Sequence, residues 1–220
     1  MARLGKSSLS SLQGNLGDMI FYQINGVTYV RRKPQKRTNA QKKKLKKSPR
    51  NERSQGMFTL TQKYLLGLNK VIKFGFQNEV IGARSARNAC VSYTRLNCFS
   101  FEDGKYAINP ALFKFCRGSL MGPENGEATR TAEGVLFSWN DNSYFSSAMP
   151  SDQAFLVIHN PQKHAVVWEE LGSYRHLKQH LLKHQFSDPQ EEWHAYLAFS
   201  QANSRTKKRI FSDSVYLGLV

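Results

Sequence analysis

The stretch that decides the fold is residues 154–168, AFLVIHNPQKHAVVW. Residues 154–159 form a nearly continuous apolar run, which is typical of a buried β-strand. Asn160-Pro161 supplies turn chemistry, and residues 165–168 continue as a partner strand. The sequence therefore predicts two neighbouring strands joined by a short turn.

Alternation with a period of two recurs on both sides of this pair. Val135, Phe137 and Trp139 share one face of a predicted strand. Further strands are expected at residues 99–101, 112–115, 194–199 and 215–219. Short strands separated by turn residues are typical of an antiparallel β-sandwich, which we expect over residues 98–220. The absence of helical segments between them argues against a parallel α/β sheet.

Residues 54–97 show helical spacing instead. Apolar residues recur every three or four positions from Met57 to Phe76, with Ser54 as the predicted N-cap and Gly75 as the predicted stop. A shorter helix is expected over residues 85–96. The predicted fold class is therefore α+β and mainly β: a sandwich preceded by a hairpin, a basic arm and one or two helices.

Residues 19–32, MIFYQINGVTYVRR, carry the clearest hairpin signal in the chain. Asn25-Gly26 suits a type I′ turn, which needs positive φ at both central residues and fixes the strand register. That register places five side chains on one face: Ile20, Tyr22, Ile24, Val27 and Tyr29. A lone hairpin is barely stable in water, so we expect this face to be an interface with the chain's own domain or a neighbouring copy. Residues 1–30 would comprise a flexible lead-in and this hairpin.

Residues 31–53, RRKPQKRTNAQKKKLKKSPRNER, form a basic arm with twelve Lys or Arg residues and one acid, Glu52. Residues 1–55 hold fourteen basic and two acidic side chains, whereas residues 56–220 hold eighteen and fourteen. Charge this dense repels itself unless a polyanion neutralises it. We therefore predict that the arm contacts nucleic-acid phosphates without reading sequence. The predicted contact residues are Arg31, Arg32, Lys33, Lys36, Arg37, Lys42, Lys43, Lys44, Lys46, Lys47, Arg50 and Arg53.

Two alternatives to nucleic-acid binding remain open for the arm. A solvated linker is the first, because charge runs are often disordered, and an acidic protein partner is the second. Phe21, Tyr22 and Tyr29 could stack on bases beside the arm. Packing within the hairpin explains these three aromatic residues equally well.

The cysteines and the hydropathy pattern indicate a cytoplasmic protein. Cys90, Cys98 and Cys116 are widely spaced and include no CxxC pair, which argues against a disulfide framework and against a zinc site. The N-terminus lacks the apolar core of a secretory signal, and no run of about eighteen apolar residues occurs. We expect buried free thiols and no membrane partner.

The sequence favours neither catalysis nor a cofactor. His176, His180 and His184 recur every four residues, but Lys178 and Lys183 between them would repel a cation, so no metal site is expected. No nucleophile elbow and no catalytic cysteine signature is present. Four aspartates lie beside turn residues, where a carboxylate usually accepts local backbone hydrogen bonds: Asp141, Asp152, Asp188 and Asp213. We therefore expect a protein that is not an enzyme.

Four segments carry a family resemblance: GNLGDMIFYQINGVTYVRRKP, RNERSQGMFTLTQKYLLGLNKVIKFGF, FSWNDNS and SDSVYLGLV. They resemble an uncharacterised family found in Bacteroidota, and the resemblance spans nearly the whole chain. It implies a glycine-framed hairpin, a helical middle and a C-terminal sandwich of immunoglobulin or fibronectin type, and it implies no activity. The dense lysines of the arm depart from the family pattern, so the nucleic-acid prediction depends on this chain's own charge.

Two functional hypotheses follow from the sequence. In the first, the sandwich is a scaffold that presents the basic arm to DNA or RNA. In the second, the chain is a structural subunit of a phage-like or other cytoplasmically assembled particle. There the hairpin would add strands to a neighbour and the arm would reach between subunits or toward a packaged genome. The size of the nucleic-acid-free protein separates the two.

Overall fold

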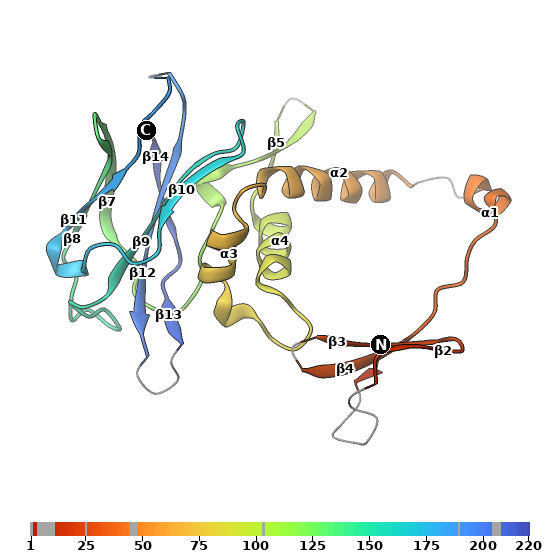
Figure 1. Ribbon diagram of the computed structural model, residues 1–220. Coiled ribbons are helices and arrows are strands. Elements are labelled where there is room, and N and C mark those ends of the chain that lie inside the picture. The colour runs from red at the N-terminus through yellow and green to blue at the C-terminus, as the bar shows by residue number, and fades with distance from the viewer. Residues whose placement is uncertain are drawn as a thin grey trace.

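The computed structural model describes residues 2–3, 12–24, 26–44, 48–102, 104–188, 190–203 and 208–220. Over these residues the chain is mainly β, with antiparallel sheets, an N-terminal sheet built on a hairpin, and four α-helices. The predicted fold class is confirmed, although the helices outnumber the one or two expected. Figure 1 shows the sandwich on one side of the helices and the N-terminal sheet on the other.

The elements occur in the following order. The helices are α1 (Asn39–Lys44), α2 (Pro49–Tyr64), α3 (Asn69–Gly75) and α4 (Ala86–Asn97), with short 3-10 helices η1 (Gln77–Glu79), η2 (Pro110–Leu112) and η3 (Arg175–Leu177). The strands before the sandwich are β1 (Ala2–Arg3), β2 (Gly14–Leu16), β3 (Met19–Ile24), β4 (Val27–Arg32), β5 (Phe99–Glu102) and β6 (Lys105–Ile108). The sandwich strands are β7 (Glu124–Thr131), β8 (Gly134–Asn140), β9 (Gln153–Asn160), β10 (Ala165–Glu169), β11 (Gln179–Lys183), β12 (His194–Ala202), β13 (Arg209–Phe211) and β14 (Val215–Leu219).

Two sheets of unequal size form the sandwich. The larger has the order β10-β9-β12-β13, with β14 also paired to β12, and the smaller has the order β11-β8-β7. Apolar side chains of both sheets form one buried core cluster, which includes Val135, Phe137, Leu156, Leu197 and Phe199. The predicted inward face of β8 is therefore part of the core.

The larger sheet is buried on both of its faces. Leu156 and Ile158 of β9 belong to the core that the two sheets share, whereas Phe155 and Val157 belong to a second core under helices α2 to α4. Successive side chains of a strand point to opposite faces, so a strand covered on both sides must be apolar at nearly every position. This explains the continuous apolar run of residues 154–159.

The helices begin and end where their capping chemistry places them. Ser48 is the N-cap of α2, since its hydroxyl accepts a hydrogen bond from the backbone N–H of Asn51 at 3.3 Å, and Pro49 occupies the first turn. The prediction that Ser54 caps this helix was wrong. The helix predicted from Met57 to Phe76 is two helices, and Gly67 between them has φ +84°.

The region from residue 112 to residue 115 also differs from its prediction. Phe113 and Phe115 are buried while Leu112 is 48% exposed, as alternation requires, yet the segment forms no strand. It follows η2 and lies against the helical core, where its two phenyl rings contact Tyr64, Phe155 and Tyr196. The side chains alternate between buried and exposed as in a strand, but no neighbouring strand pairs with this segment, so the predicted strand does not form.

The N-terminal sheet has the order β1-β4-β3-β2. The hairpin register is the predicted one: Ile24 pairs with Val27, Tyr22 with Tyr29, and Ile20 with Arg31. Gly26 has φ +75°, as its place in the predicted turn requires, while Asn25 lies outside the described residues. The turn chemistry alone was therefore sufficient to align these strands.

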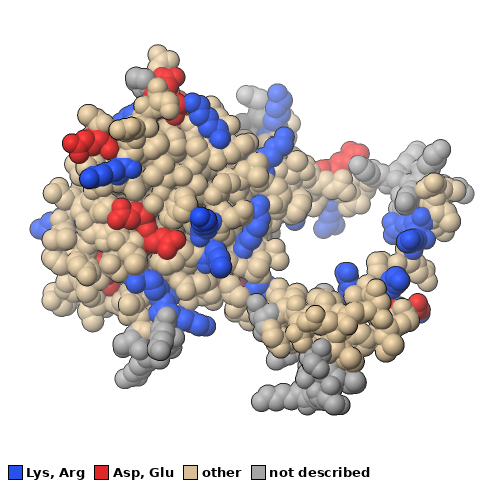
Figure 2. Space-filling model, in the orientation of Figure 1, with Lys and Arg blue, Asp and Glu red and all other residues tan. Residues whose placement is uncertain are grey.

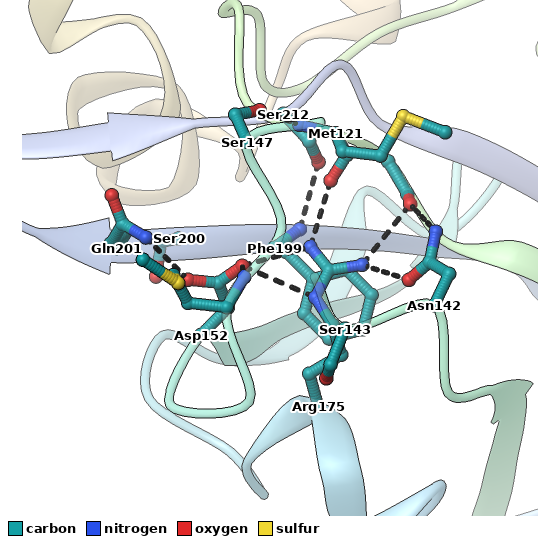
Figure 3. A network of polar contacts seen from close by, with 12 residues as sticks. Met121, Asn142, Ser143, Ser147, Asp152, Arg175, Phe199, Ser200, Gln201 and Ser212 are labelled. Atoms are coloured by element: carbon teal, nitrogen blue, oxygen red, sulfur yellow. Dashed lines mark hydrogen bonds and ion pairs between the residues drawn. The ribbon is translucent and has the colours of Figure 1, made fainter. Parts of the chain in front are cut away.

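A buried ion pair joins the loops at one end of the sandwich (Figure 3). Arg175 and Asp152 are both fully buried, with Nη2 3.0 Å from Oδ2. The guanidinium also donates to the side-chain oxygen of Asn142 and to the carbonyls of Met121 and Gly122. Four segments are thus fixed to one another, because residues 121–122, Asn142 and Asp152 supply the partners that the buried guanidinium of Arg175 requires.

The four aspartates are not equivalent. Asp141, Asp152 and Asp188 accept local backbone hydrogen bonds as predicted, from Ser143, Met149 and Gln190 respectively. Asp213 instead accepts from the N–H of Gly118 at 3.1 Å and pairs with Lys114. Asp213 therefore connects two segments that are distant in sequence and does not stabilise a local turn.

Candidate nucleic-acid interface

The basic arm connects the N-terminal sheet to the helices. It leaves β4, passes through α1 and enters α2 at Pro49. Its exposed side chains are those of Arg31, Arg32, Lys33, Lys36, Arg37, Arg50 and Arg53. Lys42, Lys43 and Lys44 lie in α1, where the backbone alone is described, and Lys46 and Lys47 lie outside the described residues.

The arm's described side chains make few contacts with carboxylates. The ion pair Arg32–Asp18 spans 3.7 Å, and its side chains are 81% and 79% exposed. Arg31 lies over the ring of Tyr22 at 5.7 Å, and Arg53 lies over the ring of Tyr106 at 4.7 Å. No other ion pair is made by the exposed arm residues that the structure describes. Their charge is therefore available to an external anion.

The arm also lies away from the acidic groups of the body. Figure 2 shows an opening between α2 and the N-terminal sheet, with Lys and Arg side chains on its border. The Asp and Glu side chains visible in the same view lie mostly on the sandwich. Like charges that line a concave surface add their potentials and attract polyanions.

The predicted hairpin interface is partly used by the protein itself. Tyr29 is buried, and its ring stacks on Tyr22 with 5.9 Å between centroids. Ile24 lines a cavity of about 440 Å³ together with Ser85 and Ala86 at the start of α4, so one end of this face docks on the body. Ile20, Tyr22, Ile24 and Val27 are half-buried. Tyr29 is thus not free to stack on bases, and packing within the hairpin, the other explanation for this residue, accounts for it.

The three regularly spaced histidines are separated by the fold. His176 follows β10 on η3 and contacts the carbonyl of Pro150, while His180 on β11 contacts Glu169 at 2.9 Å. His184 packs against Phe186 and Trp193. Within the described part of the chain, no group of three His, Cys, Asp or Glu residues is arranged to hold a metal ion.

The cysteines are buried thiols. Cys90, Cys98 and Cys116 are free, and burial raises the pKa of Cys90 and of Cys98 to about 12. Burial raises the pKa of Cys116 in the same direction, with a smaller contribution from Asp213. None of the three is a nucleophile at neutral pH, because the thiolate is the reactive form.

Sequence reasoning missed a pocket beside the arm. It lies at the C-terminal half of α2 and has a volume of about 560 Å³. Tyr64, Tyr106, His164 and His194 contribute to its lining. These residues come from separate segments that only the folded chain brings together, so no local motif marks them.

Fold and surface together define a class of protein: a mainly antiparallel β-protein with an N-terminal sheet and an exposed basic arm. The chain belongs to the family described as "Family of unknown function (DUF6266)", whose model matches residues 11–218. No curated protein and no solved structure matches the chain. Among the described residues, no helix has both the length and the apolar character needed to cross a lipid bilayer.

Proposed function

We propose that this protein binds nucleic acid through phosphate contacts made by its basic arm, without sequence specificity and without catalysis. The observation that carries the proposal is the exposure of the arm. Its described arginine and lysine side chains face solvent, and one of them, Arg32, pairs with a carboxylate. A dense set of cations that the protein leaves accessible is suited to a polyphosphate.

The charge distribution supports the same proposal. Residues 1–55 hold fourteen basic and two acidic side chains, so the arm carries most of the formal charge of +16. About ten phosphate contacts would give a slope of log affinity against log salt on the order of −9 for duplex and −7 for single strands. Lysine and arginine contacts to phosphate position a protein but carry no base information.

A charge variant of the full chain tests this proposal. Lys33→Gln, Lys36→Gln and Arg37→Gln together remove three exposed arm cations. We expect weaker binding to every sequence tested and a salt slope that is shallower by about 2 to 3. Fluorescence anisotropy with labelled DNA and RNA between 50 and 200 mM salt measures both quantities.

A matched control removes the same charge from the body. Lys70→Gln, Lys178→Gln and Lys183→Gln are also exposed positions, on α3, after η3 and at the end of β11. This variant should keep the wild-type salt slope to within about one unit. If both triple variants lose affinity equally, the arm is not the binding element and net charge alone explains the attraction.

A structural role in a larger assembly is the second candidate, and a separate observation favours it. Leu16 at the end of β2 is 69% exposed and Met19 at the start of β3 is 53% exposed. β2 is an outer strand of the described N-terminal sheet. An outer strand with exposed apolar residues is suited to pairing with a neighbouring subunit.

The mass of the nucleic-acid-free protein distinguishes these candidates. Light scattering after a high-salt wash should give a monomer for the nucleic-acid binder and a ring or larger particle for the subunit. Leu16→Lys should dissociate such a particle and leave a monomer unchanged. Dissociation by this single substitution would favour the structural role.

Three narrower features belong to the same proposal. We propose a cytoplasmic location, which the buried free thiols support, since such thiols persist in a reducing compartment. The immunoglobulin or fibronectin type of the sandwich is proposed from the resemblance of the sequence. The resemblance also supports an origin in Bacteroidota.

A further inference from the structure

The pocket beside the arm, called here the α2 pocket, has the size of a small-molecule site. Its volume is about 560 Å³, within the range of roughly 300 to 1,000 Å³ that is usual for ligand sites. Six residues that line it are Leu60, Lys63, Tyr64, Tyr106, Glu192 and His194. They come from α2, β6, the start of β12 and the loop just before it, which holds Glu192.

The α2 pocket is continuous with the basic arm. Arg53, an arm residue, lies over the ring of Tyr106 at 4.7 Å, and Tyr106 lines the pocket. Arg53, Leu60 and Tyr64 are spaced by seven and four residues along α2, so they share one face of the helix. Seven residues of helix span roughly 10 Å, which keeps the arm's cation close to the pocket.

The polar groups of the pocket favour a ligand without net charge. Lys63 supplies a cation and Glu192 supplies an anion, so either sign on a ligand would meet repulsion as well as attraction. Burial lowers the pKa of His194, whose Nδ1 lies 3.0 Å from the hydroxyl of Tyr216. A neutral, planar ligand with hydrogen-bond donors and acceptors on its edge suits these polar side chains. A nucleobase has that chemistry.

Tyr64, which lines the pocket, is held in place through its hydroxyl group. The hydroxyl of Tyr64 lies 3.2 Å from that of Tyr196, which donates to the carbonyl of Pro110 at 3.0 Å. His159 does not line the pocket, and its ring lies edge-on to that of Tyr64 with 5.0 Å between centroids. Among the described histidines it is the one whose two ring nitrogens are both buried and unpaired. Both nitrogens are shielded from solvent and His159 does not line the pocket, so any hydrogen bond offered to a ligand comes from the residues that do line it.

We infer that the α2 pocket takes one base of a single-stranded nucleic acid whose phosphates lie along the basic arm. The inference rests on the proposed function. Single strands present unstacked bases that aromatic and apolar side chains can stack on, whereas a duplex keeps its bases paired. The arm would supply affinity for both forms, and the pocket would supply a preference for the single strand.

The test is a variant that fills the pocket without changing charge. Ala107→Trp places a large ring at an exposed lining position of β6. The control is Ala132→Trp, at an exposed turn between β7 and β8 outside the pocket. Probes are labelled twelve-nucleotide strands of thymidine DNA and of uridine RNA, a DNA duplex, and a strand of equal length whose nucleotides lack bases.

The expected result is selective. Ala107→Trp should weaken binding of the normal single strand about tenfold, the loss of one stacked base, with no change for the duplex or in the salt slope. The wild type should bind the abasic strand about tenfold more weakly than the normal strand, and Ala107→Trp should cause no further loss on it. A loss with DNA alone or RNA alone identifies which strand the pocket accepts.

Opposite results separate this inference from the proposed function. If the wild type binds normal and abasic strands equally, or if Ala107→Trp weakens duplex and single strand alike, the base pocket is refuted. The arm's function would stand in either case, provided that the arm triple variant still loses salt-dependent affinity. If the arm variant binds as tightly as the wild type, both proposals fail. The abasic measurement needs no mutant, so it decides the matter even if Ala107→Trp does not fold.

Discussion

The sandwich and the basic arm use the same chemical group in opposite ways. In the sandwich, the Arg175 guanidinium is fully buried and has Asp152, Asn142 and two backbone carbonyls as partners. In the arm, Arg32 is 81% exposed and pairs loosely with Asp18. A buried charge must be matched within the fold, whereas an exposed charge is already stabilised by water. The first kind determines stability, and the second kind remains available for binding.

The largest effect is expected at the buried ion pair of Arg175 and Asp152. Asp152→Ala leaves a buried guanidinium without its counter-charge, and we expect a loss of about 3 to 5 kcal/mol. The melting temperature should fall by about 6 to 20 °C, measured by circular dichroism. Adding Arg175→Met should restore part of this loss, because it removes the unpaired buried charge, although the acceptors on Asn142, Met121 and Gly122 lose their donor. A variant as stable as the wild type would show that the pair contributes little to the fold.

Acid should destabilise the body, and the arm holds no histidine that could contribute. Burial lowers the pKa of His159 from 6.5 to about 3. Between these values the unfolded state takes up a proton that the folded state does not, so stability falls as the pH drops from 6.5 toward 3. This group alone gives up to about 1.4 kcal/mol per pH unit.

His159→Phe isolates that contribution. The ring is retained beside Tyr64 but cannot be protonated, so urea unfolding should show a shallower loss of stability between pH 6.5 and pH 4. His194 keeps its own lowered pKa in the variant, which leaves part of the dependence in place. An unchanged pH profile would mean that His159 is protonated in the folded protein.

A smaller effect is expected at two helix caps, one on the arm side and one beside the core. Ser48 caps α2 where the arm enters it, and Ser85 caps α4 beside the core. Each alanine substitution should cost its helix about 1 kcal/mol. Because the first turns of α2 are exposed, Ser48→Ala should speed amide exchange there with little change in melting temperature. Ser85→Ala should lower the melting temperature by about 2 to 4 °C, and equal shifts for both would contradict this assignment.

The smallest effect is expected at the surface ion pair. Arg32→Gln removes a contact between two side chains that are both about four-fifths exposed. Such pairs are worth a few tenths of a kcal/mol, so the melting temperature should stay within about 1 °C. The nucleic-acid salt slope should nevertheless become shallower by about 1. A large change in melting temperature would show that Arg32, like Arg175, contributes to the stability of the fold.

Local chemistry explains what the sequence could predict. The Asn-Gly turn fixed the pairing of Tyr22 with Tyr29, because a two-residue loop leaves one register. The apolar runs located β9 and β12, and Ser85 located the start of α4, where its hydroxyl accepts from the N–H of Asn88. In each case the signal and the structure lie within a few residues of each other.

Contacts between distant segments explain what it could not predict. Gly67, in the turn between α2 and α3, lies beside the carbonyl of His164, a contact that no helical periodicity reveals. Distant segments must also come together to pair Arg175 with Asp152 and to line the α2 pocket. Candidate binding residues on the arm were visible from composition, while the pocket required the fold.

The buried thiols have a practical consequence for measuring the arm. Maleimide reagents react with thiolates, and the raised pKa values of Cys90 and Cys98 keep these groups protonated at neutral pH. A cysteine introduced at exposed Thr38 would therefore take a fluorophore selectively in the otherwise natural chain. Energy transfer from that fluorophore to a labelled oligonucleotide would report directly how near the strand comes to the arm.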